Sequence, residues 1–178
     1  EDHAARMAAQ ANIVTSDTPR TGTRAGGINI VFNINATGAP AGYQTAFTAA
    51  EAYLEAQFAD PITITLTVSW ANLGGSVLGA TGSNYQSGVS WATSRTMLVN
   101  SMGADDVIQA FLPTGSSIPV RFTATSATVT NVSSVDWTRG NYKAAGGGIS
   151  GGTEGNMQLN NAFSWDFDVT NGVSSSLV

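Results

Sequence analysis

The stretch ITITLTVSW, residues 62–70, constrains the fold of this chain more than any other segment. Large apolar side chains occupy every second position, namely Ile62, Ile64, Leu66, Val68 and Trp70. Threonine and serine fill the positions between them. This period of two predicts a β-strand with one apolar face. Because a shift of one residue would turn all the large apolar groups into water, the register of the strand should be firmly specified.

A strand and a helix are predicted before this segment. Residues 28–34, INIVFNI, show the same period of two and predict a strand. Apolar side chains then recur at spacings of three and four residues, namely Tyr43, Phe47, Ala50, Leu54 and Phe58. This spacing predicts a helix with one apolar stripe, which the pair Asp60-Pro61 ends.

The segments that follow are less regular. Residues 71–90 are rich in glycine, serine and asparagine and predict a long loop, whereas residues 91–112 predict a helix with a break at Gly103. Residues 120–132 predict a strand, and the glycine-rich residues 144–155 predict a loop. Residues 156–168 return to a strand-like pattern.

The order of these elements is strand, helix, strand, helices and strands, which indicates an α+β or mixed α/β fold. We expect a single domain over residues 28–178, in which two or three helices pack on a twisted, mainly β-sheet. Residues 1–27 include the turn-rich stretch TSDTPRTGTRAGG and are expected to form an extended N-terminal arm.

Composition excludes several classes of function. Charged residues make up 11% of the 178 residues, the net charge is −5, and the seven lysines and arginines are scattered. A nucleic-acid partner would require a basic patch, so none is expected. No apolar run reaches the roughly 18 residues of a membrane span. The absence of cysteine excludes disulfides and cysteine-ligated metal centres. A surface built from serine, threonine, asparagine, glycine and alanine suits a secreted protein, or one that packs against copies of itself.

Four stretches, taken in order, resemble a known family. They are INIVFNINATGAPAGYQTAFTAAEAYLEAQFADPITITLTVSW, SRTMLVNSMGADDVIQAFLP, WTRGNYKAAGG and FSWDFDVTNG. The chain resembles the N-terminal part of secreted bacterial zinc metalloproteases of metzincin type. The resemblance implies a metzincin-like N-terminal subdomain and a secreted, extracellular or cell-surface location. It also implies that an edge strand of the sheet aligns a peptide substrate in extended form.

In that family a segment like FSWDFD…NG is followed shortly by a helix with His-Glu-x-x-His. This sequence contains one histidine, His3, which lies in the expected arm. A catalytic zinc needs about three protein ligands and a position for water. We therefore assign no catalytic, zinc-binding or cofactor-binding residue in this sequence, and zinc is expected only if that helix follows.

Two weaker metal sites remain open. Asp166 and Asp168 flank Phe167 and offer hard oxygen ligands of the kind that calcium prefers. The alternative is that they are solvated carboxylates on one face of a strand. His3 with its two acidic neighbours could bind a metal ion, or it could be part of a solvated terminus.

Two hypotheses of function follow. In the first, the chain is a non-catalytic extracellular structural domain that associates with copies of itself, as a filament or surface-layer subunit would. Strand edges without charged side chains invite pairing with another chain. The most strand-like stretch of the arm could be the added strand, namely Ala11, Asn12, Ile13, Val14, Thr15 and Ser16. In the second hypothesis, the chain is the N-terminal part of a secreted zinc metalloprotease that binds a peptide substrate.

Overall fold

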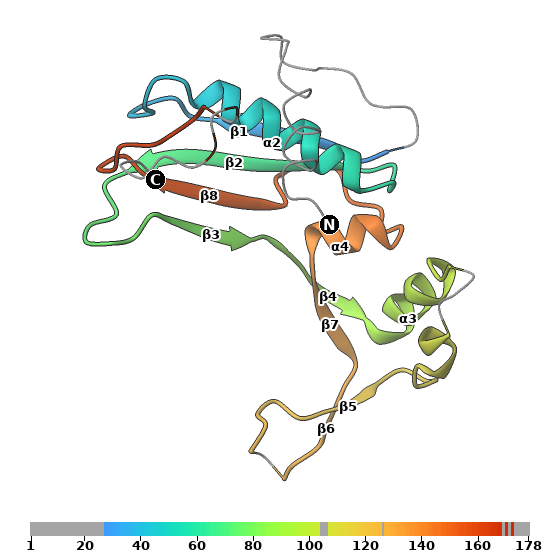
Figure 1. Cartoon of the computed structure of the whole chain (residues 1–178). Helices are drawn as coiled ribbons and strands as arrows, with labels where there is room; N and C mark the ends of the chain where they lie inside the picture. The colour runs from blue at the N-terminus through green and yellow to red at the C-terminus, as the bar shows by residue number, and fades with distance from the viewer. Residues whose placement is uncertain (1–26, 104–106, 126, 169, 171, 173–178) are drawn as a thin grey trace. The chain divides into compact units, whose positions relative to one another are not determined.

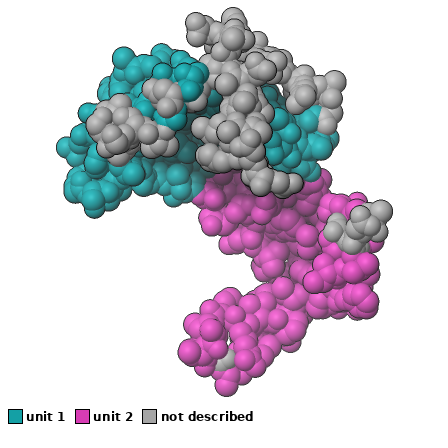
Figure 2. Space-filling model, in the orientation of Figure 1, with its two compact units in different colours: residues 1–82, 155–178 teal, residues 83–154 magenta. Residues whose placement is uncertain are grey.

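The computed structural model describes residues 27–103, 107–125, 127–168, 170 and 172. Figure 2 shows that the chain divides into two compact units. Unit 1 comprises Glu1–Gly82 and Gly155–Val178, and unit 2 comprises Ser83–Glu154. The single domain expected over residues 28–178 stays a prediction, and its range covers unit 2 and the part of unit 1 that follows residue 27.

Unit 1 is built on a four-stranded sheet with the strand order β1-β2-β8-β3 (Figure 1). Its strands are β1 (Asn29–Ile34), β2 (Thr63–Ala71), β8 (Gly155–Asn160) and β3 (Gly79–Ser83). β1, β2 and β8 are parallel, with Phe32 opposite Leu66 and Val68 opposite Met157. β3 runs antiparallel to β8, so the sheet is mixed and the expected α+β class is confirmed.

The two strands predicted from alternation are confirmed as β1 and β2. Ile30, Val68 and Trp70 are among the most buried apolar residues of the chain, and Thr63 at the start of β2 is exposed. Burial of this apolar face is what stabilises the pair, because each large side chain removed from water contributes about 1.5–3 kcal/mol.

Helix α2 (Tyr43–Gln57) connects β1 to β2 and packs on β1. It begins after Gly42, whose φ of 90° lies in the left-handed region that favours glycine. The rings of Phe47 and Phe32 meet edge to face at 5.0 Å. The predicted apolar stripe is wrong at Ala50 and Phe58, which are exposed. Phe58 lies beyond the end of the helix, where the chain is already extended.

Unit 2 contains two small antiparallel sheets and short helices. Its elements are β4 (Tyr85–Ser90), α3 (Trp91–Asn100), η1 (Ile108–Phe111), β5 (Ile118–Val120), β6 (Thr130–Val132), β7 (Ser134–Thr138) and α4 (Arg139–Ala144). β4 pairs with β7, and β5 pairs with β6. The Ser90 hydroxyl caps α3 by accepting a hydrogen bond from the Thr93 N–H. Val89 and Trp91 are buried in this unit.

Three sequence predictions need correction. The loop predicted over residues 71–90 contains β3 and β4, because pairing with β8 and β7 makes strands of segments that lack apolar alternation. The strand predicted over residues 120–132 is replaced by the short strands β5 and β6. Phe122 between them is 73% exposed, so this segment has no buried face to hold a continuous strand. The strand-like pattern of residues 156–168 extends only to Asn160, where β8 ends.

The helix predicted over residues 91–112 is confirmed in its first part. α3 ends at Asn100, and Ser101 caps it with its backbone N–H. The second part is a short 3-10 helix whose Ile108 and Phe111 side chains are exposed. None of the helices in the described ranges has the length and apolar character that crossing a membrane requires.

Candidate functional site

The outer edge of β3 is the first feature of interest. β3 stands at the end of the sheet order, and each of its five residues is exposed. Its sequence, GATGS, carries neither charge nor proline. Natural proteins commonly protect edge strands with charged residues, proline or a covering element. β3 has neither of the first two, so its backbone is a candidate for pairing with another polypeptide.

The hydrogen bonds at the two ends of β3 show which backbone groups face outward. The Asn160 N–H donates to the Leu78 carbonyl at 2.9 Å, and the Asn84 N–H donates to the Glu154 carbonyl at 2.9 Å. In an antiparallel pair, alternate residues exchange hydrogen bonds with the partner strand. Residues 78, 80, 82 and 84 therefore face β8, and the N–H and C=O groups of residues 79, 81 and 83 point to the outer edge.

β3 and β8 approach each other closely because glycine occupies both strands. A Cβ at Gly155 would lie 2.8 Å from the Gly82 carbonyl oxygen and 3.2 Å from a methyl of Leu66. A Cβ at Gly82 would lie 2.8 Å from the Asn156 side-chain oxygen. The contact at Gly155 is with backbone and is too short for a side chain, so this position favours glycine, whereas the Asn156 side chain near Gly82 can move aside.

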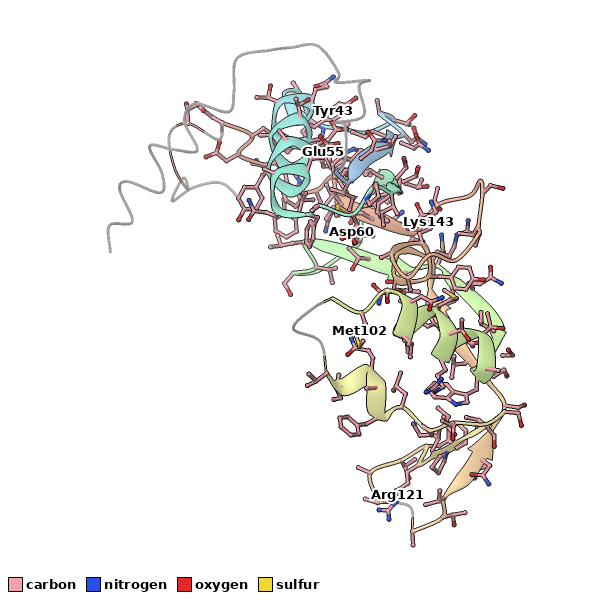
Figure 3. All side chains as sticks on the ribbon, turned by 90° about the vertical axis from the view of Figure 1, so that its right-hand side faces the viewer. Tyr43, Glu55, Asp60, Met102, Arg121 and Lys143 are labelled. Carbon is pink, nitrogen blue, oxygen red and sulfur yellow. The ribbon has the colours of Figure 1, made fainter. Side chains whose placement is uncertain are left out.

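The opposite edge of the sheet, at β1, is different. The Asn29 N–H donates to the Ile62 carbonyl at 2.8 Å and the Asn35 N–H to the Val68 carbonyl at 2.9 Å, so odd-numbered residues face β2. The Ile30 N–H points outward, and it donates to Glu55 Oε1 at 2.9 Å. Glu55 extends from α2 (Figure 3) and is 9% exposed. The buried carboxylate of Glu55 thus accepts a hydrogen bond from the first outward-facing N–H of β1.

Glu51 lies one helical turn before Glu55 and is half-buried. Burial raises the pKa of Glu51, and the neighbouring charge of Glu55 raises this pKa further. Two carboxylates therefore share the face of α2 that lies nearest to β1. Sequence reasoning missed both residues, because glutamate is an ordinary choice on a helix and nothing in the pattern marked Glu55 as buried.

An aromatic cluster follows β8 and fixes its end. The Trp165 indole N–H donates to the Asn160 carbonyl at 2.7 Å, and the fully buried Asn160 side chain donates to the Val77 carbonyl at 2.7 Å. Trp165 stacks on Phe167, and both rings meet the buried Trp70 edge to face at 6.1 Å. Trp70, which lies on the predicted apolar face of residues 62–70, is buried. The cluster supports the end of the sheet at which β3 begins.

The two carboxylates suggested for calcium lie in successive turns beside this cluster. Asp166 Oδ1 accepts the Asp168 N–H at 3.0 Å. Asp168 Oδ1 accepts the Thr170 hydroxyl at 2.6 Å and the Thr170 N–H at 2.9 Å. These two hydrogen bonds, the hydroxyl first, lower the pKa of Asp168. Each carboxylate thus bonds to the local chain, and the calcium site stays a prediction.

Among the described residues, no group of three or more histidine, cysteine, aspartate or glutamate side chains could hold a metal ion. These residues therefore do not fit the zinc site of the family that the sequence resembles. His3 and the segment Ala11–Ser16 lie outside the described residues.

Unit 2 contains a buried ionic cluster that sequence reasoning did not find. Glu154 Oε1 lies 2.7 Å from Lys143 Nζ and 3.7 Å from Arg139 Nε, and its side chain is 3% exposed. Arg139 also donates to the Gly151 carbonyl. The Asn84 side-chain amide donates to the Thr153 carbonyl at 2.8 Å. These bonds hold the end of the glycine-rich loop against α4 (Arg139–Ala144), which indicates a structural role.

Comparison of the chain with protein-family models, with curated proteins and with solved structures found no match. The assignment of function therefore depends on the geometry of the two sheet edges.

Proposed function

We propose that this chain is a non-catalytic extracellular domain that associates with copies of itself by strand addition. The β3 edge of one copy receives the segment Ala11–Ser16 of another. The observation that carries the proposal is the character of the β3 edge, which is exposed along its whole length and free of charge. In strand addition the main-chain hydrogen bonds supply affinity, and alternate side chains supply specificity.

The proposed partner segment matches this edge in length and chemistry. ANIVTS contains neither proline nor a charged residue, and Ile13 and Val14 have high strand propensity. Val77 and Leu78, which directly precede β3, are 45% and 44% exposed. They offer apolar contacts to a strand that lies beside Gly79, Thr81 and Ser83. The polar, weakly charged composition of the chain agrees with an extracellular location.

The proposal is tested by the mass of the full chain in solution as a function of concentration, measured by light scattering. Thr81→Pro removes an outward-facing N–H, and proline is tolerated in an edge strand where its nitrogen faces solvent. The matched control is Thr81→Val, which keeps the backbone donor and has high strand propensity. We expect the wild type and T81V to associate, and T81P and a chain without residues 1–27 to remain monomeric. A monomeric wild type would contradict the proposal, and so would association that both changes leave intact.

A second candidate is favoured by the same mixed sheet. In the metzincin-type family that the sequence resembles, an edge strand aligns a peptide substrate in extended form. β3 is an exposed antiparallel edge strand of that kind, so it could receive a substrate peptide in place of a second copy. In this case the natural protein would carry His-Glu-x-x-His shortly after residue 178. Intact mass and the downstream gene sequence decide the question, and a natural protein without that motif would exclude this candidate.

A further inference from the structure

We infer that Glu55 closes the outer edge of β1, so that a strand can add to this sheet at β3 but not at β1. The statement about β3 rests on the proposed function, whereas the closure of β1 stands on its own contacts. Glu55 therefore determines which edge of the sheet is available to a partner.

The closure follows from the Ile30 N–H. A strand added beside β1 would have to place a carbonyl oxygen opposite this outward-facing donor. Glu55 Oε1 already occupies that position at 2.9 Å. The carboxylate would also repel an incoming carbonyl oxygen, since both groups are hydrogen-bond acceptors. An added strand would therefore lose one ladder bond and meet a negative charge at the start of β1.

The position of Glu55 is set by the helix that carries it. α2 packs on β1, and the Phe47 ring meets Phe32 of the same strand. Glu55 follows Phe47 by eight residues, about two helical turns, so the same face of α2 reaches the beginning of β1. Burying a carboxylate is costly unless it is hydrogen-bonded. The Ile30 N–H provides such a bond, and in return this outward-facing donor of β1 has an acceptor.

The test uses three substitutions in the full chain, each alone and combined with T81P. Glu55→Ala and Glu55→Leu remove the acceptor, and the leucine variant restores the volume if the alanine variant does not fold. Glu55→Gln is the matched control, because its amide oxygen can still accept from the Ile30 N–H. Amide hydrogen exchange at Ile30 and solution mass are measured for each protein.

With Glu55→Ala or Glu55→Leu we expect Ile30 exchange in the dilute monomer to be about tenfold faster, as for a lost hydrogen bond. We also expect an additional association that T81P does not abolish. Glu55→Gln should retain slow exchange and the wild-type mass. Unchanged Ile30 protection would overturn the inference. Faster exchange without additional association would also overturn it, since Glu55 would then satisfy a donor without excluding a strand.

The outcome is separable from the proposed function. If the wild type is monomeric and T81P changes nothing, strand addition at β3 is rejected. Association of Glu55→Leu would still show that β1 is an edge that Glu55 keeps closed.

Discussion

The two edge strands of the unit 1 sheet differ in how their outward-facing backbone groups are treated. β1 is built from large residues, packs against α2, and has its Ile30 N–H bonded to a buried carboxylate. β3 is built from glycine, alanine, threonine and serine, and its residues are exposed. Exposed strand edges are sites of pairing with other chains, and covering an edge is one way to prevent it. In our proposal this sheet is therefore protected at β1 and available to a partner at β3.

The largest expected effect concerns the aromatic cluster that supports β8, the strand next to β3. Trp165→Ala removes the stack on Phe167, the edge contact with Trp70 and the hydrogen bond to the Asn160 carbonyl. We expect the free energy of unfolding to fall by about 3 kcal/mol, as for other large aromatic truncations. Urea denaturation measures it. Trp165→Phe keeps a ring and should lose about 1 kcal/mol, the worth of the hydrogen bond. If both variants lost the same amount, the packing of the ring would not matter.

A second effect concerns the close approach of β3 to β8. In Gly155→Ala the new methyl would lie 2.8 Å from the Gly82 carbonyl oxygen, so one strand must move. We expect a loss of about 2 kcal/mol, typical of overpacking, together with faster amide exchange in β3. Gly148→Ala is the matched control, because its methyl would have no neighbour within 4 Å. A Gly155→Ala protein as stable as the control would contradict the pairing of β3 with β8.

The third effect is the loss of stability when the Ile30 N–H of β1 loses its acceptor. Glu55→Ala leaves the buried Ile30 N–H without its acceptor, which should lower the free energy of unfolding by about 1.5 kcal/mol. Thr81→Val, a side-chain substitution in the open edge strand, should have almost no effect on the stability of the monomer. Urea denaturation measures the free energy of unfolding of both variants. Equal losses would contradict the difference that we describe between β1 and β3.

The smallest effect is a dependence of stability on pH, which arises from Glu51 on α2. Burial and the charge of Glu55 raise the pKa of Glu51 above its ordinary value of 4.5. The folded protein therefore binds this proton more tightly than the unfolded chain, and stability falls as pH rises from the ordinary value through the raised one. Because Glu51 is partly exposed, we expect Glu51→Gln to gain less than about 0.5 kcal/mol at neutral pH. Denaturation curves at acidic and neutral pH measure this change in the free energy of unfolding. A Glu51→Gln protein that is less stable than the wild type at neutral pH would contradict the prediction.

The sequence predicts the strands and the helix that carry their own apolar pattern. β1, β2 and α2 follow from the periodicity of residues such as Ile64, Val68 and Phe47. β3 could not be predicted in this way, because GATGS contains no large apolar residue and becomes a strand only through its pairing with β8. Glu55 is a second example. Its burial depends on how α2 is rotated on β1, and a glutamate beside Leu54 does not reveal that rotation.

The central claim is tested most directly by the amide exchange of Ile30 and Thr81 in the same dilute sample of the full chain. We expect the Ile30 amide to exchange slowly, because it donates a hydrogen bond to Glu55. We expect the Thr81 amide to exchange rapidly in the monomer and slowly after association. Slow exchange at Thr81 in the dilute monomer, or rapid exchange at Ile30, would contradict the account.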